Sequence, residues 1–137
     1  MKDVLFDKAY YEKFYLDAKT QAVSTQEQER QVNLIHAYVN YLQVEIRSVL
    51  DLGCGLGVFL QCLKAAMPNV DTTGVEISDF LCHQHGWSKG SVVDFGIDSE
   101  QQYDLVICND VLAYLSNAQC AKAIKNIAKL TRQCLYL

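Results

Sequence analysis

The pattern of apolar and polar residues along the chain predicts strands that alternate with helices. Short, unbroken apolar runs indicate strands buried on both faces, whereas apolar residues at every third or fourth position indicate helices with one buried face. By these criteria we expect strands at residues 47–52, 70–76, 91–93, 103–108 and 133–137. Helices are expected at residues 3–18, 24–43, 58–67, 78–84 and 116–131.

This alternation predicts an α/β fold with one parallel, doubly wound sheet, right-handed crossovers and helices on both faces. Two helices precede the first strand. Residues 1–44 are therefore expected to form a helical segment packed on the domain, and residues 45–137 its core. Helix starts are indicated by the capping patterns Ser24-x-x-Glu27 and Ser116-x-x-Gln119. A length of 137 residues suits a single domain.

A glycine-rich turn separates the first predicted strand from the helix that follows it. Glycines at 53, 55 and 57 suit a sharp turn whose backbone N–H groups come close to a ligand of the nucleotide type. A dinucleotide fingerprint that starts at Gly53 requires glycine or alanine at position 58, where this chain has Val58. An NAD(P)-dependent oxidoreductase is therefore a disfavoured alternative.

The pattern Asp51-x-Gly53-x-Gly55-x-Gly57 resembles the first motif of class I S-adenosylmethionine (SAM) dependent methyltransferases. The resemblance implies a strand order of 3-2-1-4-5, with SAM bound at the carboxyl ends of the strands where the order reverses. It further implies a set of cofactor contacts at the ends of successive strands. These are Asp51, Gly53, Cys54, Gly55, Gly57, Glu76, Ile77, Asp94, Phe95 and Asn109.

Acidic residues follow two further predicted strands. Glu76 suits a ribose, because a carboxylate can accept hydrogen bonds from both the 2′ and the 3′ hydroxyl. Asp94 matches the position at which the family commonly places an acid near the adenine amino group, and Phe95 is expected to stack or pack on the adenine. The alternative interpretation, which does not use the resemblance, is that Glu76 is a polar residue at the end of a strand and that Asp94 forms a turn.

The segment at residues 109–115 resembles the part of these enzymes that passes beside the methionine end of SAM and the acceptor. Many relatives have histidine where this chain has Tyr114, so a histidine base is not predicted. Asp110 and Tyr114 are candidate bases by position only, and the catalytic residues stay unassigned.

Aromatic residues recur at helical spacing in the first predicted helix. Phe6, Tyr10 and Phe14 share one face, with Tyr11 and Tyr15 beside it. This stripe either packs on the body of the domain or forms a lid over the cofactor or acceptor. A lid fits the N-terminal extension of many such methyltransferases.

Composition and charge indicate where the protein is located and which kinds of molecule it binds. Half of the residues are apolar, the net charge is −4, and no apolar run approaches the roughly 20 residues of a membrane span. With no signal peptide pattern at the N-terminus, a cytoplasmic protein is expected. The basic stripe at Lys122, Lys125 and Lys129 fits a solvated helix face, so a small-molecule or protein acceptor is preferred to nucleic acid. The six cysteines are expected to be reduced thiols, and no metal site is predicted.

The sequence reaches only the fifth strand of the expected sheet, whereas the family's sheet continues with a sixth and an antiparallel seventh. We therefore expect a fragment, a truncated gene product or a minimal domain. An uncovered apolar edge tends to pair, so a homodimer through the fifth strand is predicted. The preferred function is SAM-dependent methyl transfer, and the alternative is a SAM-binding or regulatory module without catalysis.

Overall fold

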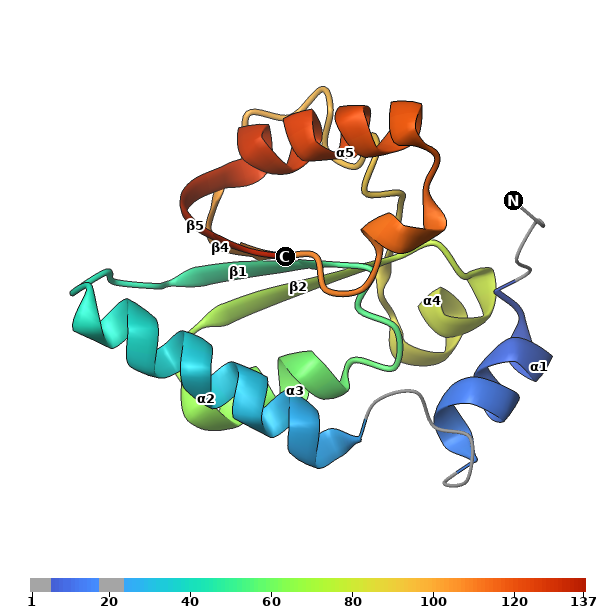
Figure 1. The fold of residues 1–137 in the computed structure, drawn as a ribbon, viewed down its shortest axis with the longest axis horizontal. Coiled ribbons are helices and arrows are strands. Elements are labelled where there is room, and N and C mark those ends of the chain that lie inside the picture. The colour runs from blue at the N-terminus through green and yellow to red at the C-terminus, as the bar shows by residue number, and fades with distance from the viewer. Residues whose placement is uncertain (1–5, 18–23) are drawn as a thin grey trace.

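The computed structural model describes residues 6–17 and 24–137. They form a five-stranded sheet in which every pairing is parallel and the strands lie in the order β3-β2-β1-β4-β5 (Figure 1). The strands are β1 (Ser48–Leu52), β2 (Asp71–Glu76), β3 (Ser88–Lys89), β4 (Tyr103–Ile107) and β5 (Thr131–Tyr136). The predicted α/β class and the order 3-2-1-4-5 are confirmed.

The central strand β1 shows why apolar residues face both sides of a strand in this sheet. Val49 pairs with Thr72 of β2 and with Leu105 of β4, so both edges of β1 are satisfied. Successive side chains point to opposite faces of the sheet, and both faces are covered. Val49 therefore joins one buried cluster and Leu50 the other, and each is fully buried.

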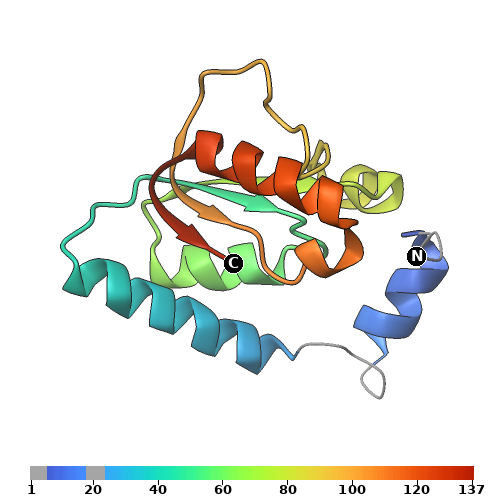
Figure 2. The same ribbon diagram turned by 45° about the horizontal axis from the view of Figure 1, so that its top comes forward.

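Helices cover both faces of the sheet, as predicted. The helical elements are α1 (Lys8–Tyr11), η1 (Glu12–Leu16), α2 (Thr25–Tyr41), α3 (Val58–Ala66), α4 (Asp79–His85), η2 (Leu112–Tyr114) and α5 (Asn117–Leu130). Figure 2 shows α2 and α3 on one side of the sheet and α5 on the other. Ile35 of α2 and Leu63 of α3 pack in the cluster that contains Val49, whereas Ile127 of α5 packs in the cluster that contains Leu50.

The predicted helix starts are capped by serine side chains. The Ser24 hydroxyl accepts a hydrogen bond from the Glu27 N–H, and α2 begins at the next residue. At Ser116 the capping box is complete, because the Gln119 side chain also accepts from the Ser116 N–H. These two helices lie within a few residues of their predicted positions.

The strand predicted at residues 91–93 is wrong. The third strand is β3 (Ser88–Lys89), and residues 92–98 form turns. The Gly90 N–H still donates to the carbonyl of Glu76, but the Ser91 carbonyl accepts from the N–H groups of Asp94 and Phe95 and turns the chain away. Val92 and Phe95 are apolar because they pack beneath α5 from this turn.

The first helix differs from the predicted span of 3–18. Of the described residues, Lys8–Tyr11 form one α-helical turn and Glu12–Leu16 a π-helical turn, in which the Asp17 N–H donates to the carbonyl of Glu12. Residues 3–5 and 18 of that prediction lie outside the described part of the chain. In both ribbon views this segment lies beyond the carboxyl ends of the central strands (Figures 1 and 2).

The outer edge of β5 carries no partner strand among residues 6–17 and 24–137. Leu135 on this strand is 43% exposed, next to a shallow apolar groove that includes Tyr38 of α2. The predicted homodimer through this edge stays a prediction.

All six cysteines are free thiols. In the described ranges, no three histidine, cysteine or acidic side chains are grouped so as to hold a metal ion. No helix in the same part of the chain is both long and apolar enough to cross a membrane.

Candidate functional site

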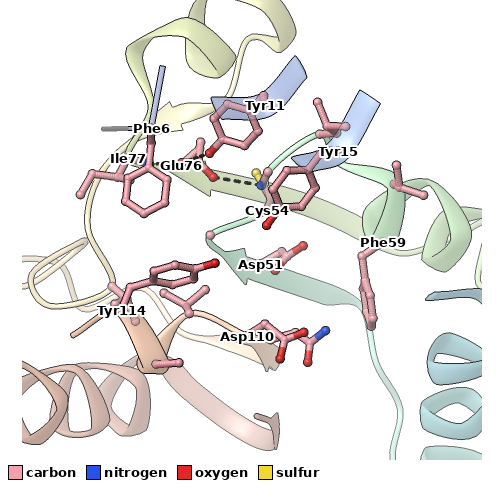
Figure 3. Close-up of a pocket in the computed structure, with 18 of the residues that line it drawn as sticks. Phe6, Tyr11, Tyr15, Asp51, Cys54, Phe59, Glu76, Ile77, Asp110 and Tyr114 are labelled. Atoms are coloured by element: carbon pink, nitrogen blue, oxygen red, sulfur yellow. Dashed lines mark hydrogen bonds between the residues drawn. The ribbon is translucent and has the colours of Figure 1, made fainter. Parts of the chain in front are cut away.

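A cavity of about 810 Å³ lies at the carboxyl ends of the central strands. Asp51 is the penultimate residue of β1 and Glu76 the last residue of β2, and both line the cavity (Figure 3). Asn109 follows β4, on the other side of β1 from β2. The strand order reverses between β1 and β4, and open α/β sheets bind ligands at such a point. The cavity is therefore where the topology of the sheet places a ligand.

The glycine turn forms one wall of this cavity, and two of its positions need glycine for different reasons. Gly53 has φ +86°, and a Cβ atom there would collide with the side chain of Val111. Gly55 has φ +54°, and the space where its Cβ would lie is open. Gly53 is thus required for packing between β1 and the segment after β4, whereas Gly55 leaves room for a ligand against the backbone.

The carboxylate of Glu76 organises the turn from the neighbouring strand. It is 3% exposed, and its Oε1 accepts hydrogen bonds from the N–H groups of Ile77 at 2.8 Å and Ser78 at 2.9 Å. A longer contact of 3.4 Å joins the same oxygen to the Tyr11 hydroxyl. Oε2 accepts from the Gly55 N–H at 3.0 Å, the single donor that the described residues give it. Oε2 therefore retains capacity to accept from a ligand hydroxyl.

Asp51 is a buried carboxyl group without a hydrogen-bond donor among the described residues. It is 4% exposed, and desolvation, with a smaller contribution from the negative charge of Glu76, raises the pKa of Asp51 to about 7. Its side chain lies at the cavity between the glycine turn and the segment after β4 (Figure 3). A cationic or N–H donating ligand group would stabilise its charged form.

The wall opposite Glu76 comes from the segment after β4. Asp110 and Tyr114 line it, and Asp110 has the left-handed φ of +57°, which is uncommon for a residue other than glycine. Asn109 also lines the cavity and donates from Nδ2 to the side chain of Gln31 at 3.4 Å. The structure thus brings both residues that sequence position singled out, Asp110 and Tyr114, to the cavity.

Aromatic side chains from the N-terminal segment form another wall of the cavity. Phe6, Tyr11 and Tyr15 line the cavity, and the Phe6 ring lies 5.5 Å from the Tyr114 ring, edge to face (Figure 3). The hydroxyls of Tyr10 and Tyr114 lie 3.2 Å apart. The stripe therefore contacts the site as well as the domain, as a lid requires. Movement of this segment as a lid stays a prediction.

Three of the predicted site residues do not line the cavity. Gly57, in the left-handed conformation, precedes α3 and packs against Trp87 instead. Asp94 is exposed, and Phe95 packs toward Gly90 and the core. Because β3 ends before Gly90, the part of this turn that reaches the cavity is residues 90–92.

Sequence reasoning missed several lining residues. The aromatic spacing gave a signal for Phe6, Tyr11 and Tyr15, whereas Thr25 and Gln28 come from the first turns of α2 and carried none. Seven predicted contacts do line the cavity. They are Asp51, Gly53, Cys54, Gly55, Glu76, Ile77 and Asn109.

The charged side chains that line the cavity in the described part of the chain are all acidic. Asp51, Glu76 and Asp110 line it, and its described lining contains no lysine, arginine or histidine. Such a cavity favours cationic ligand groups and disfavours free anions.

Comparisons with known proteins give a family and a fold. The family described as "Methyltransferase domain" matches residues 50–133. A comparison with curated proteins gave no match. The similar solved structures have low sequence identity, so they bear on the fold.

One is CalS10 from Micromonospora echinaspora, an amino pentose methyltransferase with SAM bound: identity is 16%, the TM-score is 0.68, and the match covers 96% of this chain and 55% of that one. KedS8, a sugar N-methyltransferase from Streptoalloteichus sp ATCC 53650, has 20% identity and a TM-score of 0.66, with 96% and 52% covered. The magnesium protoporphyrin IX methyltransferase ChlM from Synechocystis PCC 6803, with bound SAH, has 21% identity and a TM-score of 0.60, with 81% and 57% covered. The chain spans about half the length of the solved structures it matches.

Proposed function

This chain belongs to the methyltransferase domain family, and we propose that it binds SAM in the cavity at the carboxyl ends of β1, β2 and β4 and acts in methyl transfer to a small-molecule or protein acceptor. The observation that carries the proposal is the pair of buried carboxyl groups, Asp51 and Glu76, on either side of the glycine turn. A volume of about 810 Å³ suits a ligand of this size.

Glu76 is proposed to hold the ribose. Its Oε1 is anchored by the backbone of Ile77 and Ser78, so the orientation of the carboxylate is fixed before a ligand arrives. Oε2 faces Gly55 and has capacity for a hydroxyl donor. The weak contact from Tyr11 can be given up at small cost.

Asp51 is proposed to face the amino group of the methionine moiety. An ammonium group beside it would favour the charged carboxylate and draw its raised pKa back down. Since none of the described residues donates to Asp51, a ligand donor would satisfy a group that is otherwise buried at a cost.

The adenine is proposed to lie along residues 90–92, which line the cavity after β3. This replaces the roles that the sequence suggested for Asp94 and Phe95, because Asp94 points to solvent and Phe95 to the core. Gly90 is required there for packing, because a Cβ atom would collide with the ring of Phe95.

When bound, SAM supplies a methyl group on a positively charged sulfur, which is already activated for transfer. The contribution left to the protein is to align the acceptor with that methyl group and to exclude water. The aromatic residues Phe6, Tyr11, Tyr15 and Tyr114 surround the cavity and can do both.

A binding panel tests this function. Isothermal titration of the chain with SAM, S-adenosylhomocysteine (SAH) and NAD is expected to give binding of the first two and none of the third. Binding of NAD alone would contradict the proposal. Release of SAH from SAM in the presence of an acceptor would separate an enzyme from a SAM-binding module without catalysis.

A further inference from the structure

The cavity has a second acidic feature that the cofactor proposal does not use. Asp110 lies on the wall after β4, three residues past Ile107, which pairs with Asp51 of β1, and its side chain has no hydrogen-bond donor among the described residues. Aromatic rings accompany it. Tyr114 comes from the same segment, and Tyr15 from the N-terminal segment borders the same space (Figure 3).

The phenol of Tyr15 at this wall stays protonated near neutral pH. Burial, together with the neighbouring Tyr114 and Asp110, raises the pKa of Tyr15. The Tyr114 hydroxyl is in hydrogen-bond contact with that of Tyr10, whose pKa is raised well above the ordinary range by desolvation and by this contact. The Tyr15 phenol therefore does not act as a base near neutral pH. Asp110 is the carboxyl group on this wall.

These groups discriminate between acceptor classes. A carboxylate or phosphate acceptor would enter a cavity whose described lining has carboxylates and no positive side chain. A hydroxyl acceptor needs a strong base to remove its proton, and an exposed carboxylate such as Asp110 is a weak one. An amine needs neither a positive side chain nor a strong base. It carries a nucleophilic lone pair once it has lost the proton of its ammonium form.

We infer that the methyl acceptor is an amine, which binds at Asp110 beside the rings of Tyr15 and Tyr114. The inference rests on the proposed methyltransferase function. The ammonium form pairs with the Asp110 carboxylate and lies against the aromatic rings, which attract cations.

The ammonium gives one proton to the Asp110 carboxylate or to water, and the free amine nitrogen forms a bond to the methyl carbon. The bond from that carbon to sulfur breaks, and its electron pair goes to sulfur. The products are a methylated ammonium and a neutral thioether.

Sinefungin probes the space next to the acceptor nitrogen, because a carbon replaces the sulfur of SAM and a primary amine replaces its transferable methyl group. Dissociation constants of sinefungin and SAH are measured by titration for the natural chain, Asp110→Asn and the control Asp98→Asn. Asp98 is an exposed aspartate outside the cavity. The natural chain and the control are expected to bind sinefungin at least tenfold more tightly than SAH. In Asp110→Asn that preference is expected to fall to twofold or less, with SAH affinity within twofold of the natural value.

A second measurement uses matched probes with the SAH-saturated chain. Benzylamine, benzyl alcohol and benzoate share one ring and differ in the head group, so their binding, followed by saturation-transfer NMR, reports the class directly. Benzylamine is expected to bind best, and Asp110→Asn to remove its advantage. Equal sinefungin and SAH affinities, a preference that survives in Asp110→Asn, or stronger binding of the alcohol or benzoate would overturn the inference. If neither SAH nor sinefungin binds, the proposed function fails as well, so the two failures are distinguishable.

Discussion

The Tyr11 hydroxyl lies 3.4 Å from Oε1 of Glu76, although the two residues are 65 positions apart in the chain. This contact ties the N-terminal aromatic segment to the carboxylate that fixes the glycine turn. Both side chains are buried. Burial, with a smaller contribution from the Glu76 charge, raises the pKa of Tyr11, so its hydroxyl is a constant donor near neutral pH.

Tyr11→Phe removes this donor and keeps the ring. The free energy of unfolding is expected to fall by about 1 kcal/mol, because the contact is long but made to a buried charge. Urea denaturation measures the change, and Tyr38→Phe is the control, since Tyr38 is 60% exposed on α2. A loss no larger than that of the control would show that the contact does not stabilise the fold.

Glu76→Ala removes the carboxylate proposed to hold the ribose. SAH binding is expected to weaken by about 1–3 kcal/mol, because the ribose hydroxyls lose their acceptor. Titration calorimetry measures this, with the exposed Glu100→Ala as the control. Because Glu76 also orients the turn, Glu76→Gln is measured beside it and both variants are checked for a cooperative thermal transition. Folded variants with natural SAH affinity would refute the ribose assignment.

The buried Asp51 makes stability depend on pH. Its pKa is raised from 3.8 to about 7 in the folded chain, so between these values the folded state binds more protons than the unfolded state. Stability from this group is fully present below about pH 4 and is lost as the pH rises to about 7.

Asp51→Asn removes that dependence. Relative to the variant, the natural chain is expected to lose roughly 1–4 kcal/mol of unfolding free energy between pH 5 and pH 8. Denaturation of both proteins at the two pH values measures the difference, in which contributions of the other titrating groups cancel. A gap between the two proteins that is the same at both pH values would mean that Asp51 does not titrate in this range.

Gly53 and Gly55 are expected to respond differently to alanine. Gly53→Ala meets both a left-handed backbone and the side chain of Val111, so a loss of about 2–4 kcal/mol of stability is expected. Gly55→Ala meets the left-handed backbone alone, at about 1–2 kcal/mol, but places a methyl group on the cavity wall. Denaturation and SAH titration together should show the larger stability loss at 53 and, among the folded variants, weaker binding at 55. Equal stability losses would contradict the packing account.

The sequence was sufficient for the glycine turn because its signal is local, whereas the strand order 3-2-1-4-5 followed from the resemblance to SAM-dependent methyltransferases. Strands β1 and β4 are mostly apolar and almost wholly buried, and Asp51, Glu76 and Asn109 stand at or near the carboxyl ends of strands, which a parallel sheet brings to one edge.

Elements set by tertiary packing were harder to predict. β3 has only two residues, Ser88 and Lys89, both exposed, so no apolar pattern marks it. The apolar Val92 gave a false strand signal because it packs in a turn beneath α5, where Asn126 donates to its carbonyl. The π-helical turn at Glu12–Leu16 likewise has no sequence pattern of its own.

A crystal structure of the chain with SAH tests the central claim most directly. We predict the ribose within hydrogen-bond distance of Glu76 Oε2, the amino group of the methionine moiety at Asp51, and the adenine along residues 90–92. SAH bound away from the glycine turn, or with its ribose remote from Glu76, would contradict the account.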